Sequence, residues 1–488
     1  MTRSYRLTVF ALAGLALVMF AYPVLRITAD FEIDYNEGWN VYLQGLVMHG
    51  VSPYSGAGAL FFNNYPPLSF YLVGLVGQLI GDDLLAGRLL SVLAMAVISV
   101  SCGLVVRASG GGKLDGLLGT ATCAAMFSAF ATDYVGVDDP QLLAQGFLCA
   151  GFATYVGGKA SPARLSAVAV LFAAGLLCKH NVLALPLVVS VHALWRAPAA
   201  GRWTFLAVGL GLIALAGGVI MLAFGSDFFH RLLAPRIYDS TRGFLLTMEA
   251  LGRIQTVLAV TVLFLLARWR SNAVTGMVAA YLVLGLALGM GFSGGAGVDI
   301  NIYFDVMIAC AMTAGLAAVW ARGCADLPAM APVAVAVLAN FGVLLLSPQV
   351  LGRMVVDGLG DYAEREALFS ADTAYLRQIA GPAVCESMLL CLRAGKPISV
   401  DPYNVLQASL TGRLPPHHLE DLLRAHAFPV VQISSSREHP LDEAPGLQVI
   451  PPRFVNFSDG VFDEIARSYT LDRVGLSGRF YRPKTNGL

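Results

Sequence analysis

The sequence predicts a polytopic α-helical membrane protein that ends in a small soluble α/β domain. Two observations predict the membrane part. Of the 488 residues, 57% are hydrophobic and only 13% are charged, whereas soluble domains contain roughly 45–50% apolar residues. The mean hydropathy is +0.67, so the chain cannot fold as a globule in water. The soluble part is predicted from about residue 350, where short β-like runs alternate with amphipathic helical stretches.

Apolar runs predict about eleven membrane spans. The first run ends without a small-residue cleavage site, so we interpret it as a transmembrane helix and expect no cleaved signal peptide. Arg3 and Arg6 before it favour a cytoplasmic N-terminus. The predicted spans are approximately 7–25, 86–107, 115–131, 141–157, 164–178, 182–195, 203–224, 247–268, 273–291, 302–320 and 329–347.

The segment 68–80, "LSFYLVGLVGQLI", decides which side of the membrane each loop faces. It is too short for a span, which needs roughly twenty residues, so we expect a helix lying at the interface. The basic loops then all fall on the cytoplasmic side, as the positive-inside rule requires. These loops are 107–113, 159–164, 196–202 and 268–270, together with Arg322.

An odd number of spans from a cytoplasmic N-terminus places the C-terminal domain outside the cytoplasm. We therefore divide the chain into a transmembrane domain, 1–349, with a long outer loop, 26–85, and an extracytoplasmic domain, 350–488. Cys385 and Cys391 could form a disulfide in that domain.

Carboxylates gather in two of the loops that this topology places outside. Asp34 and Glu37 lie in "DFEIDYNEGWN", and Asp138 and Asp139 lie in "ATDYVGVDDPQ". A carboxylate in such a place can take the proton of a hydroxyl that attacks an electrophilic carbon. The alternative is that the first loop is simply solvated and that Asp-Asp-Pro marks the start of a helix.

Cationic residues gather in two further outer loops. They are Lys179 and His180 in "CKHN", and His230, Arg231 and Arg236 in "DFFHRLLAPRIYDSTRG". Such groups can hold a phosphate and stabilise it as it leaves. Alternatively, Lys179 snorkels to the membrane surface and His230 and Arg231 contact lipid headgroups.

Several function classes lose support from the sequence. The net charge is zero and no basic stripe occurs, so we expect no nucleic-acid partner. No P-loop, Rossmann motif or Cys/His cluster is present; a divalent cation is compatible with the site but not indicated. A transporter or flippase of a lipid-linked or anionic substrate is the alternative, although it would place its polar groups near the midplane. A non-catalytic assembly partner is a third interpretation.

Several motifs resemble those of the GT-C superfamily of membrane glycosyltransferases. The chain is most similar to bacterial relatives of the protein O-mannosyltransferases and the lipid A aminoarabinose transferases. The motifs that carry the resemblance are "DYNEGWNVYLQGLVMHGVSPY", "NNYPPLSFYLVGLVGQLIGDDLLAGRLLSVL", Asp138-Asp139-Pro140, "GLLCKHN", "GGAGVDINIYFDVMIA" and the C-terminal run from "CESMLLC" to "FPVVQIS".

This resemblance implies a GT-C fold in a bacterial inner membrane. It implies an inverting enzyme that moves a sugar from a polyprenyl-phosphate carrier to a lipid, glycan or protein acceptor on the extracytoplasmic face, without a nucleotide. The motifs further suggest Tyr65, Asp299 and Tyr303 as substrate-binding residues. Family members commonly carry adjacent Asp-Glu in the first loop, whereas this chain has Asp34-Tyr35-Asn36-Glu37. We expect Asp34 to be the base and Glu37 to orient the acceptor or cap a helix.

Overall fold

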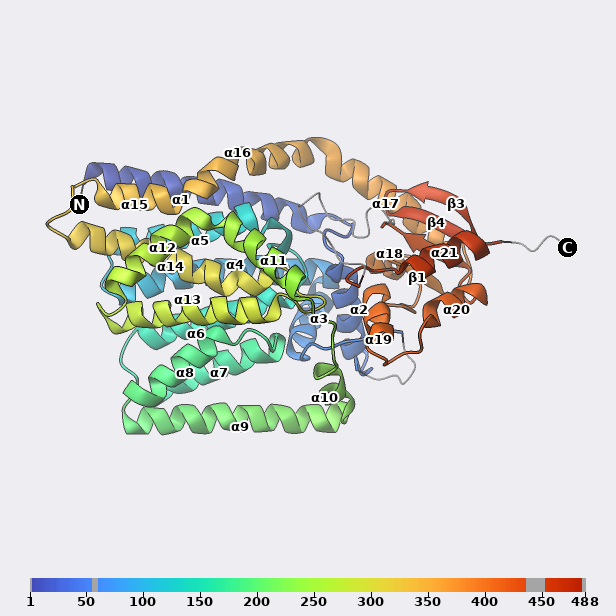
Figure 1. The fold of residues 1–488 in the computed structure, drawn as a ribbon, viewed down its shortest axis with the longest axis horizontal. Coiled ribbons are helices and arrows are strands. Elements are labelled where there is room, and N and C mark those ends of the chain that lie inside the picture. The colour runs from blue at the N-terminus through green and yellow to red at the C-terminus, as the bar shows by residue number, and fades with distance from the viewer. Residues whose placement is uncertain (1, 55–59, 436–452, 485–488) are drawn as a thin grey trace.

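The computed structural model describes residues 2–54, 60–435 and 453–484. Long helices run side by side as a bundle, with the N-terminus at one end and a small α/β domain at the other (Figure 1). We call the end of the bundle next to this domain the domain end. The bundle consists of α1 (Arg3–Leu25), α4 (Asp83–Ala108), α5 (Lys113–Phe130), α6 (Pro140–Val156), α7 (Pro162–Cys178), α8 (Ala184–Arg196), α9 (Ala199–Phe224), α11 (Ser240–Arg253), α12 (Gln255–Arg268), α13 (Ala273–Phe292), α14 (Phe304–Gly323), α15 (Ala331–Ala339) and α16 (Phe341–Val356).

Each predicted span coincides with one or two of these helices. The predicted span 247–268 is broken, because α11 and α12 meet at an angle of 84°. By length and composition, six of the described helices could cross a membrane, or seven if the bent pair counts as one span. The chain is therefore a multi-pass membrane protein, while the number of eleven spans stays a prediction.

Two shorter helices lie between the bundle and the α/β domain. They are α2 (Asn36–Met48) and α3 (Leu68–Ile80), and both lie at the domain end (Figure 1). Phe70 and Val73 of α3 are buried, whereas Leu75 and Leu79 are exposed. With only 13 residues, α3 has the length and the exposed apolar face expected of a helix at a membrane surface.

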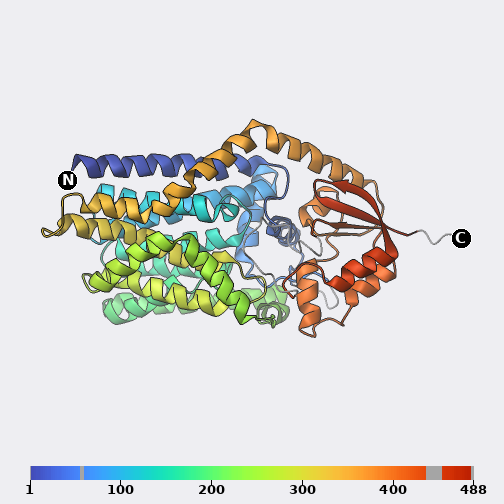
Figure 2. The same ribbon diagram turned by 45° about the horizontal axis from the view of Figure 1, so that its top comes forward.

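A nearly continuous helix joins the bundle to the domain. After α16, a π-helical turn (Asp357–Asp361) leads directly into α17 (Tyr362–Arg377). Figure 2 shows this connection arching from the bundle towards the sheet. The boundary predicted at residue 350 falls inside α16.

The domain itself is a mixed four-stranded sheet with short helices. Its strands, β1 (Ala383–Cys385), β2 (Val430–Ile433), β3 (Tyr469–Gly475) and β4 (Gly478–Pro483), are arranged in the order β1-β2-β4-β3. The pair β1–β2 is parallel and the other pairs are antiparallel. The helices are α18 (Met388–Arg393), α19 (Pro402–Leu410), α20 (His418–Arg424) and α21 (Asp459–Ser468). The α/β class is confirmed, and a disulfide joins Cys385 to Cys391.

The domain shares a hydrophobic core with α2, in the loop that follows α1. Trp39 and Leu43 of α2 are buried in one cluster with Leu389 of α18 and Phe480 of β4. Polar contacts add to this packing, since Arg393 forms an ion pair of 2.8 Å with Asp30. The domain is therefore fixed to the loop that carries the predicted carboxylates.

Candidate active site

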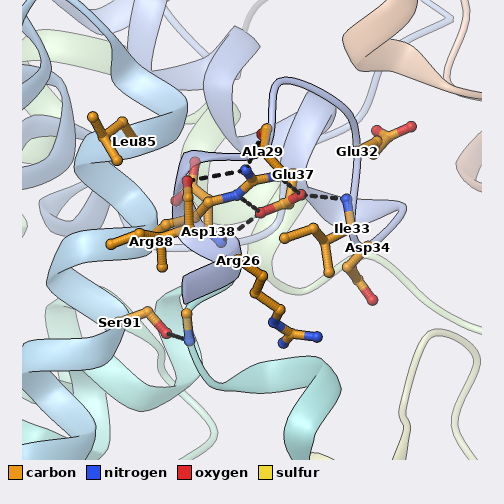
Figure 3. A network of polar contacts seen from close by, with 12 residues as sticks. Arg26, Ala29, Glu32, Ile33, Asp34, Glu37, Leu85, Arg88, Ser91 and Asp138 are labelled. Carbon is orange, nitrogen blue, oxygen red and sulfur yellow. Dashed lines mark hydrogen bonds and ion pairs between the residues drawn. The ribbon is translucent and has the colours of Figure 1, made fainter. Parts of the chain in front are cut away.

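The acidic loop is folded around one buried arginine. Arg88 of α4 forms two 2.7 Å contacts with the carboxylate of Glu37, and the side chains of both residues are 0% exposed (Figure 3). The same guanidinium donates hydrogen bonds to the carbonyl oxygens of Ile27, Ala29 and Phe31, at 3.2, 2.5 and 2.7 Å. One side chain thus determines the path of the backbone from residue 27 to residue 37.

Glu37 has no carboxylate oxygen left for a substrate. Besides Arg88, its Oε2 accepts a hydrogen bond from the Ile33 amide at 2.7 Å, and its Oε1 accepts one from the Asp138 amide at 3.2 Å. These contacts favour a structural role for Glu37. The sequence interpretation missed Arg88, although a lone cation within the apolar run 84–106 is a recognised signal of function or pairing.

Asp34 points away from this network (Figure 3). Its Oδ1 accepts hydrogen bonds from the backbone and side-chain nitrogens of Asn36, both at 2.8 Å. Within the described parts of the chain, no donor reaches its Oδ2. Burial raises the pKa of Asp34 to about 8, and the carboxylates of Glu37 and Asp139 also raise it. Asp34 thus combines a free oxygen with a pKa suited to a general base near neutral pH.

Glu32 ties the same loop to the α/β domain. Its carboxylate accepts hydrogen bonds from the Ser387 hydroxyl and from the Gly38 amide, the latter at 3.2 Å. A Cβ at position 38 would lie 2.2 Å from the Leu389 nitrogen, so only glycine permits this close approach. Burial raises the pKa of Glu32 to about 8.

The two aspartates after α5 have different surroundings. Asp138 is buried against α2, where its carboxylate accepts a 2.7 Å hydrogen bond from Gln44 and its carbonyl accepts one from Asn40. Burial raises the pKa of Asp138 well above its usual range. A Cβ on Gly87 would lie 2.2 Å from this carboxylate. Asp139 instead caps α6 through a 2.7 Å hydrogen bond from the Gln141 amide and faces Lys179. The Asp-Asp-Pro run is therefore a helix start that also bears on the site.

Lys179 ends α7 and is almost completely buried. Its Nζ lies 3.4 Å from Asp139 Oδ1 and 4.9 Å from the centre of the Tyr65 ring. Burial alone would lower the pKa of Lys179, but Asp139 and Tyr65 raise it overall. Burial, Lys179 and Arg236 lower the pKa of His180 to about 4. His180 is therefore neutral at pH 7 and cannot neutralise a phosphate there.

Tyr134 is a residue that the sequence interpretation missed. Its hydroxyl donates a 2.7 Å hydrogen bond to Asp299. Burial raises the pKa of Tyr134 well above its usual range, and Asp299, Asp34 and Asp139 raise it further. Tyr134 thus lies among three predicted site residues from three different loops. It belongs to the quoted run "ATDYVGVDDPQ", where an aromatic hydroxyl beside acids was the available signal.

Comparisons with known proteins bear on the fold of the chain. Residues 64–221 match a family model described as dolichyl-phosphate-mannose-protein mannosyltransferase. The crystal structure of ArnT from Cupriavidus metallidurans in the apo state matches with a TM-score of 0.60 and 14% identity, over 97% of each chain. The chain has a GT-C fold.

Two further GT-C structures were solved with polyprenyl carriers. ArnT from Cupriavidus metallidurans bound to undecaprenyl phosphate matches with a TM-score of 0.60 and 13% identity, over 98% of each chain. The archaeal oligosaccharyltransferase AglB from Archaeoglobus fulgidus matches with a TM-score of 0.53 and 10% identity. That structure is a complex with an inhibitory peptide and a dolichol-phosphate. The match covers 98% of this chain and 74% of AglB. A search of curated protein sequences gave no match.

The structure places the other predicted site residues in different surroundings. Arg231 of α10 (Asp227–Leu232) is half-buried, with its guanidinium 4.7 Å from the centre of the Phe62 ring. Arg236 is exposed and donates a 2.9 Å hydrogen bond to the Ala296 carbonyl. His230 is exposed on α10. Tyr303 is buried inside the bundle, where its hydroxyl contacts Thr247 at 2.5 Å.

The acidic residues do not form a metal site within the described chain. No group of three or more His, Cys, Asp or Glu side chains there is placed to hold a metal ion. The arrangement instead joins one free carboxylate oxygen, an Asp139–Lys179 pair and several arginines at the domain end. Such a set can remove a proton and bind an anion.

Proposed function

We propose that the protein transfers a sugar from a polyprenyl-phosphate carrier to an acceptor hydroxyl, with inversion, at the domain end of the bundle. The observation that carries this proposal is Asp34, a carboxylate with an unoccupied oxygen in a GT-C fold. Asp34 lies near Asp139, which pairs with Lys179. The carriers bound to ArnT and AglB, undecaprenyl phosphate and dolichol-phosphate, support the donor class. The acceptor is a lipid, a glycan or a protein.

The proposed reaction is a direct displacement at the anomeric carbon. The acceptor oxygen forms a bond to this carbon while its proton moves to Asp34 Oδ2. The bond between carbon and phosphate oxygen breaks on the opposite face, and its electron pair leaves with the polyprenyl phosphate. Lys179, Arg231 and Arg236 stabilise the charge that develops on this phosphate. Attack opposite to the leaving group inverts the configuration.

An apolar groove on the broken helix supports a lipid donor. The groove has a volume of about 460 Å³ and lies along α11 and α12. Its lining residues are Met248, Leu251, Gly252, Gln255, Leu258, Ala259 and Val262. An open apolar groove on the bundle can receive a prenyl chain, and in this proposal the phosphate lies at the domain end.

Purified protein in liposomes, supplied with polyprenyl-phosphate sugars carrying a radiolabel, tests the proposal. Transfer of the label to an added acceptor extract supports it. Movement of the intact labelled lipid between leaflets, without transfer, would instead identify a flippase. If neither transfer nor movement occurs, a non-catalytic partner is favoured.

The rate should depend on the protonation of Asp34. Because the base works as a carboxylate, we expect kcat/KM to rise with pH through a midpoint near 8, the pKa of Asp34. Glu32 titrates near the same pH, so Glu32→Gln is the matched control and should keep this midpoint. A rate that stays constant from about pH 6 to pH 9 in the wild type would contradict the assignment.

Lys179→Met should weaken donor binding. Loss of a charge-assisted contact costs roughly 1.5–3 kcal/mol, or about 10- to 150-fold in Kd. The substitution also strands the buried carboxylate of Asp139, so Lys179→Met with Asp139→Asn is the control that restores neutrality. Equilibrium binding of polyprenyl phosphate should be weak in both variants. Wild-type affinity in the double variant would show that Lys179 only balances Asp139.

We also propose that the domain end faces away from the cytoplasm of a bacterial inner membrane. The basic loops and the acidic loops lie at opposite ends of the bundle, which supports this orientation. A reporter enzyme that works only in the periplasm should be active when fused after Leu488 and inactive when fused at Gly111. Activity at Gly111 would reverse the orientation.

A further inference from the structure

The segment 60–65 presents two aromatic rings to two separate groups of cations. The Tyr65 ring lies 4.9 Å from Lys179 Nζ. The Phe62 ring lies 4.7 Å from the guanidinium carbon of Arg231 and 5.4 Å from that of Arg413. Arg413 follows α19 and belongs to the α/β domain, so the second group combines the bundle with the domain.

The two groups differ in charge balance. Lys179 is paired with the carboxylate of Asp139, so little net charge remains there. Around Phe62, burial lowers the pKa of Arg413, and the nearby Arg236 and Arg231 lower it further. Burial also lowers the pKa of Arg231, which Asp227 partly offsets. The positive charges of Arg413, Arg231 and Arg236 are therefore held near one another in a partly desolvated place. A bound anion would reduce the repulsion between them.

Arg413 is held in place from its own domain. Its amide donates a 2.8 Å hydrogen bond to the Ala408 carbonyl, and its Nε donates one of 3.0 Å to the Thr411 hydroxyl. In residues 2–54, 60–435 and 453–484, neither terminal nitrogen of Arg413 donates a hydrogen bond. The domain is in turn joined to this segment, because the Asp401 amide donates a 2.7 Å hydrogen bond to the Leu60 carbonyl.

We propose that Arg413, together with Arg231 and Arg236, forms a binding site for a phosphate-class anion. Guanidinium groups bind phosphate oxygens through paired N–H donors, which an ammonium cannot do. The α/β domain thereby supplies a substrate-binding residue. The anion is either the phosphate of the lipid donor or an anionic group of the acceptor, and this part of the inference rests on the proposed function.

Equilibrium binding to the purified full-length protein tests the site, with inorganic phosphate and polyprenyl phosphate as probes. Arg413→Gln should weaken the binding of inorganic phosphate at least about tenfold. Arg413→Lys keeps the charge but loses the paired donors, so we expect an intermediate loss. Arg467→Gln is the matched control, since it removes an exposed arginine from the same domain (66% exposed side chain) and should leave both affinities unchanged. Thermal unfolding of each variant establishes that it is folded.

The pattern of losses identifies the source of the anion. If the affinity for polyprenyl phosphate falls in parallel with that for inorganic phosphate, the site is assigned to the donor. A loss for inorganic phosphate alone, with a raised KM for the acceptor, assigns it to the acceptor. Unchanged binding of inorganic phosphate by folded Arg413→Gln and Arg413→Lys would overturn the site. Because the binding of inorganic phosphate is measured without turnover, this test of the site stands even if the protein proves not to be a transferase.

Discussion

Asp34→Asn is expected to lower the turnover number by about 10²–10⁴-fold when the lipid donor is saturating, as for the loss of a general base. The amide keeps the size of the side chain but cannot accept the proton of the acceptor hydroxyl. Donor binding should change little, because the cations that hold the phosphate remain. The measurement is single-turnover transfer of labelled sugar, with the affinity for polyprenyl phosphate determined on the same preparation.

Asp30→Asn is the matched control for this experiment. It removes a carboxylate from the same loop, but Asp30 is 66% exposed and pairs with Arg393, so its turnover should be nearly normal. Asp139→Asn should affect donor binding through Lys179 more than it affects the chemical step. Near-normal turnover in Asp34→Asn beside an inactive, fully folded Glu37→Gln would move the base to Glu37. Full activity in Asp34→Asn, Glu37→Gln and Asp139→Asn would exclude the acidic-loop mechanism.

Glu37→Gln should destabilise the protein by about 3–5 kcal/mol, the usual cost of removing one partner of a buried ion pair. Arg88 is 0% exposed, so its charge would remain in the interior without a counter-ion. Arg88→Met should also release the carbonyl oxygens of Ile27, Ala29 and Phe31. Both variants should unfold at a lower temperature in detergent, and hydrogen exchange should increase first in the loop.

Asp421→Asn provides the comparison, since the ion pair between Asp421 and Arg424 has a similar distance of 2.8 Å but exposed side chains. We expect it to cost about 0–1 kcal/mol. A Glu37→Gln protein as stable as the wild type would contradict the structural role. If that protein were also inactive, Glu37 would have to act in the chemistry itself.

Much of the fold follows from patterns that are local in the chain. Apolar runs predict where the helices lie, and Asp82 and Asp139 mark helix starts because their side chains cap the next turn. The length of segment 68–80 predicts a helix that does not span, and α3 has those bounds. The break between α11 and α12 was not predicted, although Glu249, Arg253 and Gln255 interrupt the apolar run 247–268 next to the break.

The partners within the site could not be predicted in the same way. Glu37 and Arg88 are 51 positions apart, and their pairing depends on how α2 and α4 pack. Asp138 and Asp139 are adjacent in the sequence, but their side chains have different partners. Asp138 faces Gln44 of α2, whereas Asp139 faces Lys179. Arg413 was missed because it lies in another domain and meets Phe62 only through the packing of that domain onto the first loop.

The core shared by α2 and the α/β domain has a consequence for biosynthesis. Trp39 and Leu43 leave the ribosome several hundred residues before Leu389 and Phe480, which cover them. At about 5–20 residues per second, this interval is on the order of tens of seconds. During that time the α/β domain does not yet cover the apolar side chains of the acidic loop. The candidate active site therefore cannot assemble on a growing chain. A ribosome that stops early releases a membrane protein with an exposed apolar patch, which is open to chaperones and proteases.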